Sequence, residues 1–397
     1  MLLRLALLAL LRPCSALAPA VKRVLVVGGS GRVGGSTVAH LNRIALQRGI
    51  SLETIVGGRS RKSFDAASER WPEVSASRFV ECNVDDAASL DSALAGMDVV
   101  VHTAGPFQQV KTPNVLDAAL RNGVAYLDVC DETALCELVK TPAYADVAKA
   151  KGVPCVVSAG IWPGVSALMA QLAVEELGGE AESLDFSFFT AGTGNAGPTI
   201  VSATFLLLCT PALVFEGGNK VDREAWSDAR DVDFGDNGVR KVRLLDCPDV
   251  LTVAKALKIP NVSSRFSTAP EVWNQLFGVS KAVMPASLLS DRAKMQALAI
   301  FSEPIVRFVD NIVGAANVMR IDATAGGKKV TLVHGHEDLE NAVGIATAAF
   351  AIQLVQNRIE PGIHWPSELS PDNRNAIVEM LLAQPGTFAW TSDAEKL

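Results

Sequence analysis

A glycine-rich turn near the start of the chain constrains the fold more than any other feature. The apolar, β-branched run Val24–Val27 enters this turn, and apolar residues at helical spacing follow it from Val33 onward. The glycines read as Gly29-x-Gly31-x-x-Gly34, or as Gly28-x-x-Gly31-x-x-Gly34. Strand, tight turn and helix in this order are typical of the first βα unit of a dinucleotide-binding Rossmann domain.

Each glycine of this turn has a physical role in either spacing. One forms the turn, one lets the backbone approach a pyrophosphate, and Gly34 lets the helix lie close to the strand. The helix N-terminus then offers unpaired N–H groups to the phosphates. The alternative is a glycine turn in an α/β protein that binds no nucleotide.

The end of the second predicted strand indicates which dinucleotide is bound. Leu52–Val56 reads as a strand and is followed by Gly57-Gly58-Arg59-Ser60-Arg61-Lys62. An NAD-preferring site places Asp or Glu here, whereas a guanidinium with a neighbouring hydroxyl suits a 2′-phosphate. We therefore expect NADP as the cofactor, held by Arg59 and Ser60. A solvated basic loop is the alternative.

The third and fourth strands add residues to the same edge of the sheet. Arg78–Val84 reads as the third strand and is followed by Asp85 and Asp86. An acidic residue here either reaches the adenine amino group of the cofactor or caps the helix that begins at Ala87. Asp98–His102 ends in the turn 103–107. Ligands of doubly wound sheets bind outside the carboxyl ends of the strands, so we expect Gly105 and Pro106 to border the cofactor.

Acidic residues follow the fifth predicted strand. The helix Asn114–Asn122 precedes the stretch Ala125–Glu132, which contains Asp128, Asp131 and Glu132. Carboxylates at this edge can orient a substrate ammonium or transfer a proton, and Asp128 and Asp131 are the catalytic candidates. Alternatively, they cap the helix predicted over 133–138.

Taken together, these stretches resemble the saccharopine dehydrogenase-like family of the NADP-binding type, in particular its plastid members from plants and algae. The likeness rests on five stretches: 26–35, Gly57-Gly58-Arg59, His102-Thr103-Ala104-Gly105-Pro106-Phe107, Tyr126–Glu132 and Ala159–Gly164. Further matches lie at 190–194 and in the last sixty residues.

The resemblance implies a Rossmann domain interrupted by an α+β substrate domain, and hydride transfer between a nicotinamide and a carbon–nitrogen bond. The family's NADP-contacting loop matches Ser30, Gly31, Arg32 and Val33; its 2′-phosphate contacts match Arg59 and Ser60; its nicotinamide-side loop matches Ala104, Gly105 and Pro106. The sequence departs from the family at Trp162, where lysine-pathway saccharopine reductases carry an Asp near the amino-acid substrate. An aromatic ring cannot form a salt bridge with an ammonium, so saccharopine itself is not the expected substrate.

The second half of the chain mixes strands with apolar segments. Ser183–Ala191 reads as a strand, and the glycine-rich loop 192–198 either contacts a ligand or starts a helix. Ile200–Phe215 is predicted to be a buried or subunit-interface helix. The region 289–318 is apolar at helical spacing, which indicates an oligomer interface or a membrane-facing surface.

A β-hairpin is predicted next, with strands at 318–324 and 330–336 joined by Gly326-Gly327. His334 and His336 lie two residues apart with Glu337 beside them, but no third histidine or cysteine completes a metal site, and we predict none. Glu340–Ile359 is expected to form a helix that returns to the Rossmann half.

Composition limits the partners. The net charge is −7 and no long basic run is present, which argues against a nucleic-acid partner. We predict no transmembrane span, a small-molecule substrate and a possible homodimer.

The first twenty residues are predicted to be a leader. Arg4 precedes the apolar run Leu5–Leu11, and small residues at Cys14 and Ala16 suit cleavage before Leu17, as in a secretory signal peptide. The run is too short to span a bilayer.

The predicted location is a plastid. The remaining cysteines show no disulfide framework, and NADP chemistry belongs inside a cell or organelle. Ser15–Pro19 is similar to the cleavage motif of bipartite leaders that direct proteins to complex algal plastids. The secretory pathway or the endoplasmic reticulum is the alternative.

These predictions define an α/β protein with a Rossmann doubly wound parallel sheet and an inserted α+β second domain. The expected parts are a leader (1–20), an NADP-binding domain (21–160), a substrate or oligomerisation domain (161–336) and C-terminal helices that return to the Rossmann domain (337–397). The predicted function is that of an NADP(H)-dependent oxidoreductase acting at a C–N or C=O bond of a small metabolite. The alternative is a non-catalytic NADP-binding scaffold or redox sensor.

Overall fold

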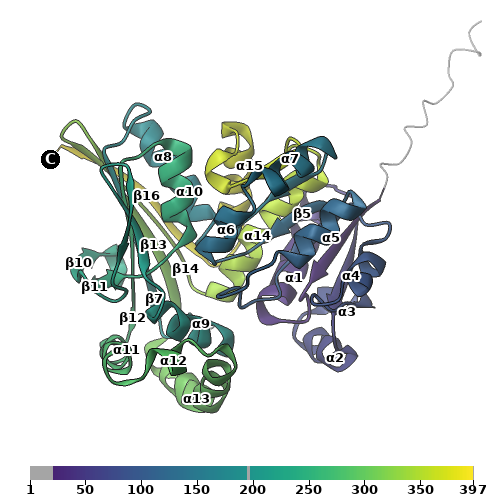
Figure 1. Cartoon of the computed structure of the whole chain (residues 1–397), viewed down its shortest axis with the longest axis horizontal. Helices are drawn as coiled ribbons and strands as arrows, with labels where there is room; N and C mark the ends of the chain where they lie inside the picture. Colours follow the sequence, from purple (N-terminus) through teal and green to yellow (C-terminus); the bar gives the residue numbers. More distant parts are fainter. Residues whose placement is uncertain (1–20, 195–196, 397) are drawn as a thin grey trace, which may run out of the picture.

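The structure of the protein, a computed structural model, describes residues 21–194 and 197–396 (Figure 1). The predicted leader, residues 1–20, lies outside the described residues. Two sheets with their helices stand side by side in Figure 1, and strands from the N- and C-terminal parts of the chain lie in the same sheet.

The first sheet has seven parallel strands in the order β15-β6-β5-β4-β1-β2-β3. Its strands are β1 (Lys22–Val27), β2 (Leu52–Gly58), β3 (Arg78–Glu81), β4 (Val99–His102), β5 (Ala125–Asp128), β6 (Pro154–Val156) and β15 (Gly362–His364). The chain runs outward from β1 in both directions, so the strand order reverses between β1 and β4. This arrangement confirms the predicted doubly wound Rossmann sheet.

Helices cover both faces of this sheet. They are α1 (Arg32–Gln47), α2 (Arg61–Arg70), α3 (Pro72–Ser75), α4 (Ala87–Leu94), α5 (Asn114–Asn122), α6 (Thr133–Leu138), α7 (Pro142–Ala150), α14 (Leu339–Val355) and α15 (Pro371–Leu382). Alternate residues of β1 enter different cores: Val24 and Val26 pack on one face, and Leu25 and Val27 on the other. Burial on both faces explains why the strand is continuously apolar.

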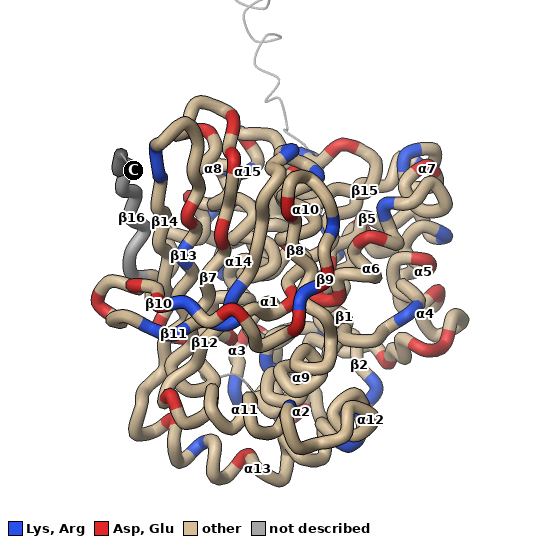
Figure 2. The backbone as a smooth tube through the Cα atoms, turned by 60° about the vertical axis from the view of Figure 1, so that its left-hand side comes forward, with Lys and Arg blue, Asp and Glu red and all other residues tan. Residues whose placement is uncertain are grey.

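The second sheet is mixed, in the order β10-β11-β12-β7-β13-β14-β16, with β8 and β9 attached to β12. Its strands are β7 (Ser183–Ala191), β8 (Ala212–Glu216), β9 (Asn219–Arg223), β10 (Arg230–Asp233), β11 (Val239–Leu244), β12 (Asn261–Ala269), β13 (Ala316–Ala325), β14 (Lys328–His336) and β16 (Thr387–Lys396). β7 and β12 pair in parallel, and the other pairs are antiparallel. The predicted hairpin is present as β13 and β14. Figure 2 shows basic and acidic positions along β9 and β10, and basic positions along β11.

The helices of this half fall into two groups. Between the sheets lie α8 (Val165–Glu176) and α10 (Pro248–Leu257), and at one end lie α9 (Pro198–Leu208), α11 (Glu271–Val283), α12 (Ala286–Leu289) and α13 (Arg292–Val313) (Figure 1). Short 3-10 turns occur at Gly235–Asn237 and Pro366–Glu368. Among the described helices, none is long and apolar enough to cross a bilayer.

Two predictions about these elements need correction. The segment Ile200–Phe215 is not one helix, because α9 ends at Leu208 and β8 begins at Ala212. Pro211, which has no N–H to continue a helical ladder, stands between them. The C-terminal part is also not only helical: β15 joins the Rossmann sheet, and β16 pairs with β14 in the second sheet.

The contact between α1 and α14 yields a stability prediction. A Cβ added at Gly344 of α14 would lie 2.1 Å from Ser36 Oγ of α1, whereas one added at Gly278 of α11 would meet only ordinary contacts, 3.6 Å or more away, with Trp226. We expect Gly344→Ala to lower the free energy of unfolding by about 1–3 kcal/mol through overpacking. Gly278→Ala, the matched control, should raise it by up to about 1 kcal/mol through helix propensity.

Urea unfolding of both variants measures these changes. Equal effects of the two substitutions would contradict the close packing of α1 on α14.

Candidate functional site

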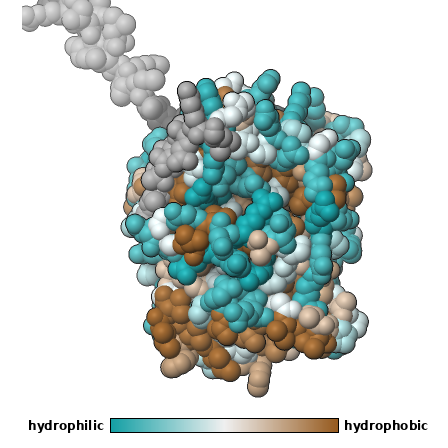
Figure 3. All heavy atoms as spheres, turned by 90° about the vertical axis from the view of Figure 1, so that its left-hand side faces the viewer, coloured by the Kyte–Doolittle hydropathy of each residue, from teal (hydrophilic) through white to brown (hydrophobic). Residues whose placement is uncertain are grey.

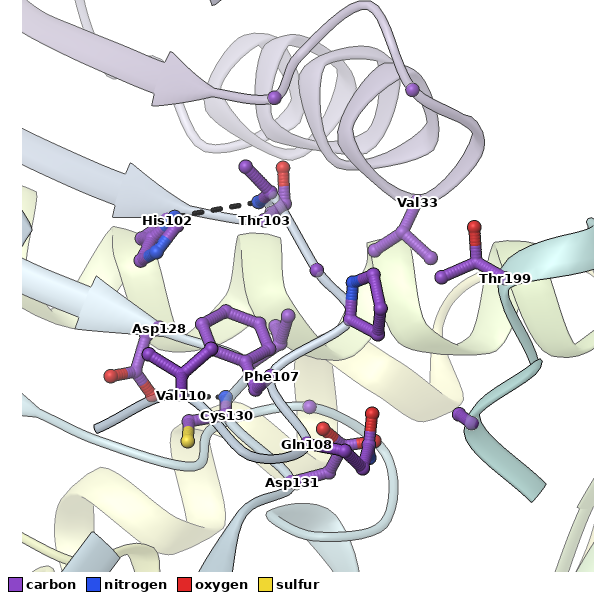
Figure 4. Close-up of a pocket in the computed structure, with 18 of the residues that line it drawn as sticks. Val33, His102, Thr103, Phe107, Gln108, Val110, Asp128, Cys130, Asp131 and Thr199 are labelled. Carbon is purple, nitrogen blue, oxygen red and sulfur yellow. Dashed lines mark hydrogen bonds between the residues drawn. The ribbon is translucent and has the colours of Figure 1, made fainter. Parts of the chain in front are cut away.

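A cleft of about 820 Å³ runs along the carboxyl ends of β1, β2, β4 and β5 and reaches the second sheet. Figure 4 shows part of its lining. It crosses the point between β1 and β4 where the strand order reverses, which is where doubly wound sheets bind their ligands. Of the thirteen residues predicted to bind the cofactor, all but Gly29 line the cleft, as do Asp128 and Asp131.

The glycine turn allows backbone segments to approach more closely than side chains permit. Gly28 has φ +83°, and a Cβ there would lie 2.8 Å from the Ala104 nitrogen. A Cβ at Gly34 would lie 2.1 Å from the Gly28 oxygen. Gly29 is buried beneath the turn, where a Cβ would lie 2.9 Å from the Val26 oxygen. The turn therefore opens onto the cleft with backbone rather than side chains.

The start of α1 suits a diphosphate. No side chain caps this helix, and its first turn contains no acidic residue, so its free N–H groups and positive dipole end face the cleft. Ser30 also lines the cleft, and its buried Oγ makes no hydrogen bond within the described chain. This set of donors fits an anionic cofactor.

The basic residues after β2 have different surroundings. Arg59 is exposed, lines the cleft and makes no ion pair with a described residue. Arg61 turns away and pairs with Asp65 at 3.0 Å. The Ser60 hydroxyl caps α2 by accepting a hydrogen bond from Ser63 N at 3.3 Å and retains its own proton for donation. Arg59 is therefore the cation of this loop that is available to a phosphate.

Of the two acidic residues after β3, one caps a helix and the other lines the cleft. Asp86 caps α4 by accepting hydrogen bonds from Ala88 N at 2.9 Å and Ser89 N at 3.3 Å. Asp85 does not cap the helix and lines the cleft. Of the two acids, Asp85 is therefore the one that borders the cleft.

The turn after β4 is held from both halves of the protein. Ala104 N donates to His102 Nδ1 at 3.4 Å, and burial lowers the pKa of His102 to about 4, so this imidazole is neutral and shapes the turn (Figure 4). On the other side, the Arg292 guanidinium of α13 donates to the Pro106 oxygen at 2.8 Å.

Asp128 is tied into the end of the sheet. It accepts hydrogen bonds from the Tyr126 hydroxyl at 2.8 Å, Cys130 N at 3.1 Å and Ser158 N at 2.7 Å. Burial raises its pKa, while these donors oppose the shift. The side chain joins the ends of β5 and β6.

Asp131 has a different environment. Its Oδ1 is buried and makes no hydrogen bond within the described chain, although the neighbouring Gln108 amide favours its charged form. Burial raises the pKa of Asp131 to about 6, and the charges of Glu132 and Asp128 act in the same direction. Figure 4 shows Gln108 and Asp131 side by side in the cleft. A carboxyl group with such a pKa can donate or accept a proton near neutral pH.

The predicted alternative, that these acids cap α6, is not what the structure shows. Glu132 precedes α6, but no side chain caps that helix. The Glu132 carboxylate instead accepts a hydrogen bond from Gln109 N at 2.7 Å.

An aromatic wall closes the far side of the cleft. The tight turn between Gly160 and Gly164 carries Trp162; Gly164 has φ +133°, and a Cβ there would lie 2.2 Å from the Gly160 oxygen. The Trp162 ring stacks on Phe188 at 4.8 Å and lies 5.8 Å from Phe266. Its Nε1 donates to Asn317 Oδ1 at 2.9 Å, which fixes the ring.

The lining residues that were not identified from the sequence include Gln108, Asp246 and Arg292. Gln108 follows the strand-end turn at 103–107, so the same rule extended by one residue would have found it. Asp246 and Arg292 are far away in the sequence and belong to no motif.

The structure places the histidine pair in the second sheet. His334 and His336 are 1% and 2% exposed, and burial lowers the pKa of His334 to about 3. Within the described residues, no group of three or more His, Cys, Asp or Glu side chains is arranged to hold a metal ion.

Comparisons with known proteins agree with this geometry. Residues 24–156 match the family model described as the saccharopine dehydrogenase NADP binding domain. This match covers about a third of the chain and confirms NADP as the predicted cofactor. No curated protein gives a significant match.

Two of the matching solved structures cover nearly the whole chain with a TM-score above 0.6. Apo saccharopine dehydrogenase (L-Glu forming) from Saccharomyces cerevisiae has a TM-score of 0.62 and 14% identity, over 94% of this chain and 100% of that one. The homospermidine synthase from Legionella pneumophila in complex with NAD has a TM-score of 0.65 and 9% identity, over 96% of this chain and 93% of that one. At these identities the likeness shows a shared fold.

The burial of Asp131 predicts a pH-dependent stability effect. Its pKa rises from 3.8 to about 6 on folding, so the folded state binds more protons than the unfolded state within this window, and stability falls as the pH rises through it. An Asn side chain does not ionise, so Asp131→Asn removes this loss of stability. We expect the variant to be more stable than the parent by about 2–3 kcal/mol at pH 7.5 and to show no such gain at pH 3.5.

Urea unfolding at the two pH values checks this. The exposed Asp146 of α7 provides the control, Asp146→Asn, which should change stability by less than about 0.5 kcal/mol at either pH. A gain for Asp131→Asn that is equal at both pH values would contradict the assignment.

Proposed function

We propose that this protein is an NADP(H)-dependent oxidoreductase of the saccharopine dehydrogenase-like type, which transfers hydride at a C–N or C=O bond of a small metabolite. The match of residues 24–156 to an NADP-binding domain supports the oxidoreductase class. The cleft leaves room for a substrate beside the cofactor, because it extends past the glycine turn to the aromatic wall.

The proposal depends mainly on Arg59. It stands at the end of β2, where NAD-binding sites place a carboxylate, and it is the cation of that loop that lines the cleft without an acidic partner among the described residues. A guanidinium binds a 2′-phosphate through charge-assisted hydrogen bonds. Arg32, by contrast, is engaged with Glu340 at 3.4 Å.

Different residues of the cleft would hold different parts of the cofactor. The glycine turn and the start of α1 would hold the diphosphate, Arg59 and Ser60 the 2′-phosphate, and the turn at Ala104–Pro106 the nicotinamide side. When bound, NADPH supplies a hydride to an electrophilic carbon.

The chain's own groups handle the proton. As the π electrons of the C=N or C=O bond move onto nitrogen or oxygen, Asp131 donates a proton to that atom and later recovers one from water. We assign Asp128 the role of holding the strand ends in place, since its three hydrogen bonds come from within the protein.

Cofactor titrations and turnover assays on the same protein test this function. We expect NADPH to bind at least tenfold more tightly than NADH, and Arg59→Ala to remove that preference without weakening NADH. Arg61→Ala is the matched control, because Arg61 pairs with Asp65, and it should leave both affinities within about twofold. NADPH consumption should appear with members of a panel of imines, ketones and amino acids.

Two outcomes would contradict the proposal in different ways. Equal binding of NADPH and NADH would reject the cofactor assignment. Tight NADPH binding with no consumption on any panel member would favour the non-catalytic scaffold.

We further propose that the protein forms a homodimer through an apolar face on α11 and α13. This face consists of side chains that are 46–80% exposed, namely Val272, Leu276, Val279, Val283, Ile300, Phe301, Ile305, Phe308 and Ile312. In Figure 3 it is the brown band at the bottom of the molecule. On α11, and on α13 from Phe301 onward, the residues recur at spacings of three and four, so they form continuous stripes.

The charges around this face favour a second copy as its occupant. None of the exposed residues from 297 to 312 is charged, and behind them Arg307 pairs with Glu303 and Asp310 at 3.6 Å. Subunit interfaces are depleted in charge at their centre. Binding to an anionic lipid surface instead requires clustered Lys and Arg, which this face lacks among the described residues.

Sedimentation in the absence of detergent tests the dimer. We expect a dimer of the 41.9 kDa chain, and we expect Phe301→Glu, which places a charge on a side chain 80% exposed, to produce a monomer. Leu46→Glu, at a side chain 83% exposed on α1, is the matched control and should remain dimeric. A monomeric parent that binds neutral phospholipid vesicles would contradict the proposal.

The plastid location stays a prediction, since the leader lies outside the described residues. The proposed NADP chemistry supports an organelle.

A further inference from the structure

The substrate half of the cleft is acidic. Beyond the glycine turn, the charged side chains lining the described cleft are Asp128, Asp131, Asp246, Glu340 and Arg292. Glu340 is already paired with Arg32 at 3.4 Å. Arg292 is exposed and donates to the Pro106 oxygen at 2.8 Å. Three carboxylates, those of Asp128, Asp131 and Asp246, therefore line this half without a cationic partner among the described residues.

One of these carboxylates forms a hydrogen-bonding site with Gln108. Gln108 is 1% exposed, and apart from its interaction with the Asp131 carboxyl, neither its amide oxygen nor its amide nitrogen has a hydrogen-bond partner within the described chain. The buried Asp131 Oδ1 beside it is also without a hydrogen bond (Figure 4). Buried polar atoms in a native protein are normally paired, so an unpaired set that faces a cleft marks a place for a ligand. The carboxylate and amide oxygens accept hydrogen bonds, as the N–H groups of an amine or a protonated imine require.

Asp246 adds a second acceptor to the same half. It accepts hydrogen bonds from the Thr133 hydroxyl at 2.6 Å and from Leu213 N at 3.0 Å, and burial raises its pKa. Because Leu213 belongs to β8 and Thr133 to α6, this carboxylate is held between the two halves of the protein.

The rest of the substrate half is apolar. The Trp162 ring, backed by Phe188 and Phe266, forms one wall. Aliphatic side chains from α9 and from the end of β11 continue it, namely Ile200, Ala203, Leu207 and Leu245. Such a wall binds hydrocarbon through surface removed from water, about 25 cal/mol per Å².

From this arrangement we infer that the cleft takes a substrate with one amine or imine group, bound by Asp131 and Gln108, and an uncharged apolar body against the Trp162 wall. Substrates with two or more carboxylates are excluded. The inference rests on the proposed function, because it names the substrate class of the same site.

The exclusion of carboxylates follows from the charges. A carboxylate in this half would lie near Asp131 and Asp246 in a site where neither like charge is screened by water, and desolvation would add to the repulsion. An ammonium or iminium in the same place gains a partner and pairs the free oxygen of Asp131. The apolar body of the ligand adds affinity without changing the preference for a cation over a carboxylate.

Calorimetry with ligands of matched shape tests the inference. The full chain, saturated with NADP⁺, is titrated with cyclohexylamine, cyclohexanecarboxylate and glutamate. We expect the amine to bind at least tenfold more tightly than the carboxylate of the same ring, and glutamate to give no measurable heat.

Variants assign the preference to residues. Asp131→Asn should remove the preference for the amine while NADP⁺ affinity stays within twofold, which also shows that the variant folds. Asp146→Asn, at an exposed acid of α7 outside the cleft, is the control and should retain the preference. Trp162→Leu should weaken the amine and the carboxylate by similar factors.

Each contrary result has a distinct meaning. Glutamate or the carboxylate binding as tightly as the amine, failure of the amine to bind, or a preference that survives Asp131→Asn would overturn the inference. Failure of NADP⁺ to bind would instead contradict the proposed function, and the same titrations without cofactor would still decide the ligand class.

Discussion

The site depends on the close approach of three backbone segments. Gly34 lies against Gly28, and Gly28 lies against Ala104, at distances that a Cβ would reduce to between 2.1 and 2.8 Å. This contact seats the first turn of α1 directly on the ends of β1 and β4. Its N–H groups then face the cleft with no side chain above them, and the nicotinamide-side turn is placed beside them. Arg59 and Asp131 are useful only because the backbone between them is fixed in this way.

Much of the Rossmann half could be predicted, because its strands are buried on both faces. A strand such as Val24–Val27 must then be apolar at every position, and the residues that contact ligands collect just after each strand ends. The sequence pattern favoured Arg59 over Arg61, two residues further on, but it did not show what makes them different. The difference arises where α2 begins: Ser60 caps the helix, Arg61 enters it and stacks on Phe64 at 4.9 Å, and Arg59 is left outside.

The parts that could not be predicted depend on contacts distant in sequence. Asp128 and Asp131 are equivalent acids by pattern, and what distinguishes them is Ser158, thirty residues away, whose N–H donates to Asp128. Asp246 and Arg292 reach the cleft from the second half through no local signal. The strand β16 is specified by the free edge of β14, which only the assembled sheet provides. Periodicity describes which face of an element is buried, and it does not describe which partner buries it.

The two ends of the cleft carry opposite charge, and this division follows from the fold. The start of α1 and Arg59 are positive because parallel strands feed helices whose N-terminal ends all point to this edge. Asp131 follows the end of β5, and Asp246 comes from the second half of the protein, so both acids lie on the side of the cleft away from Arg59. A phosphorylated cofactor would be neutralised at its own end and would add negative charge to the cleft. An anionic substrate would then meet both that charge and the acids, whereas a nitrogen bearing N–H groups would be drawn to the remaining free carboxylate oxygen. Leaving Asp131 unpaired in the folded chain costs stability, and folds retain such unpaired acids at sites where a ligand completes them.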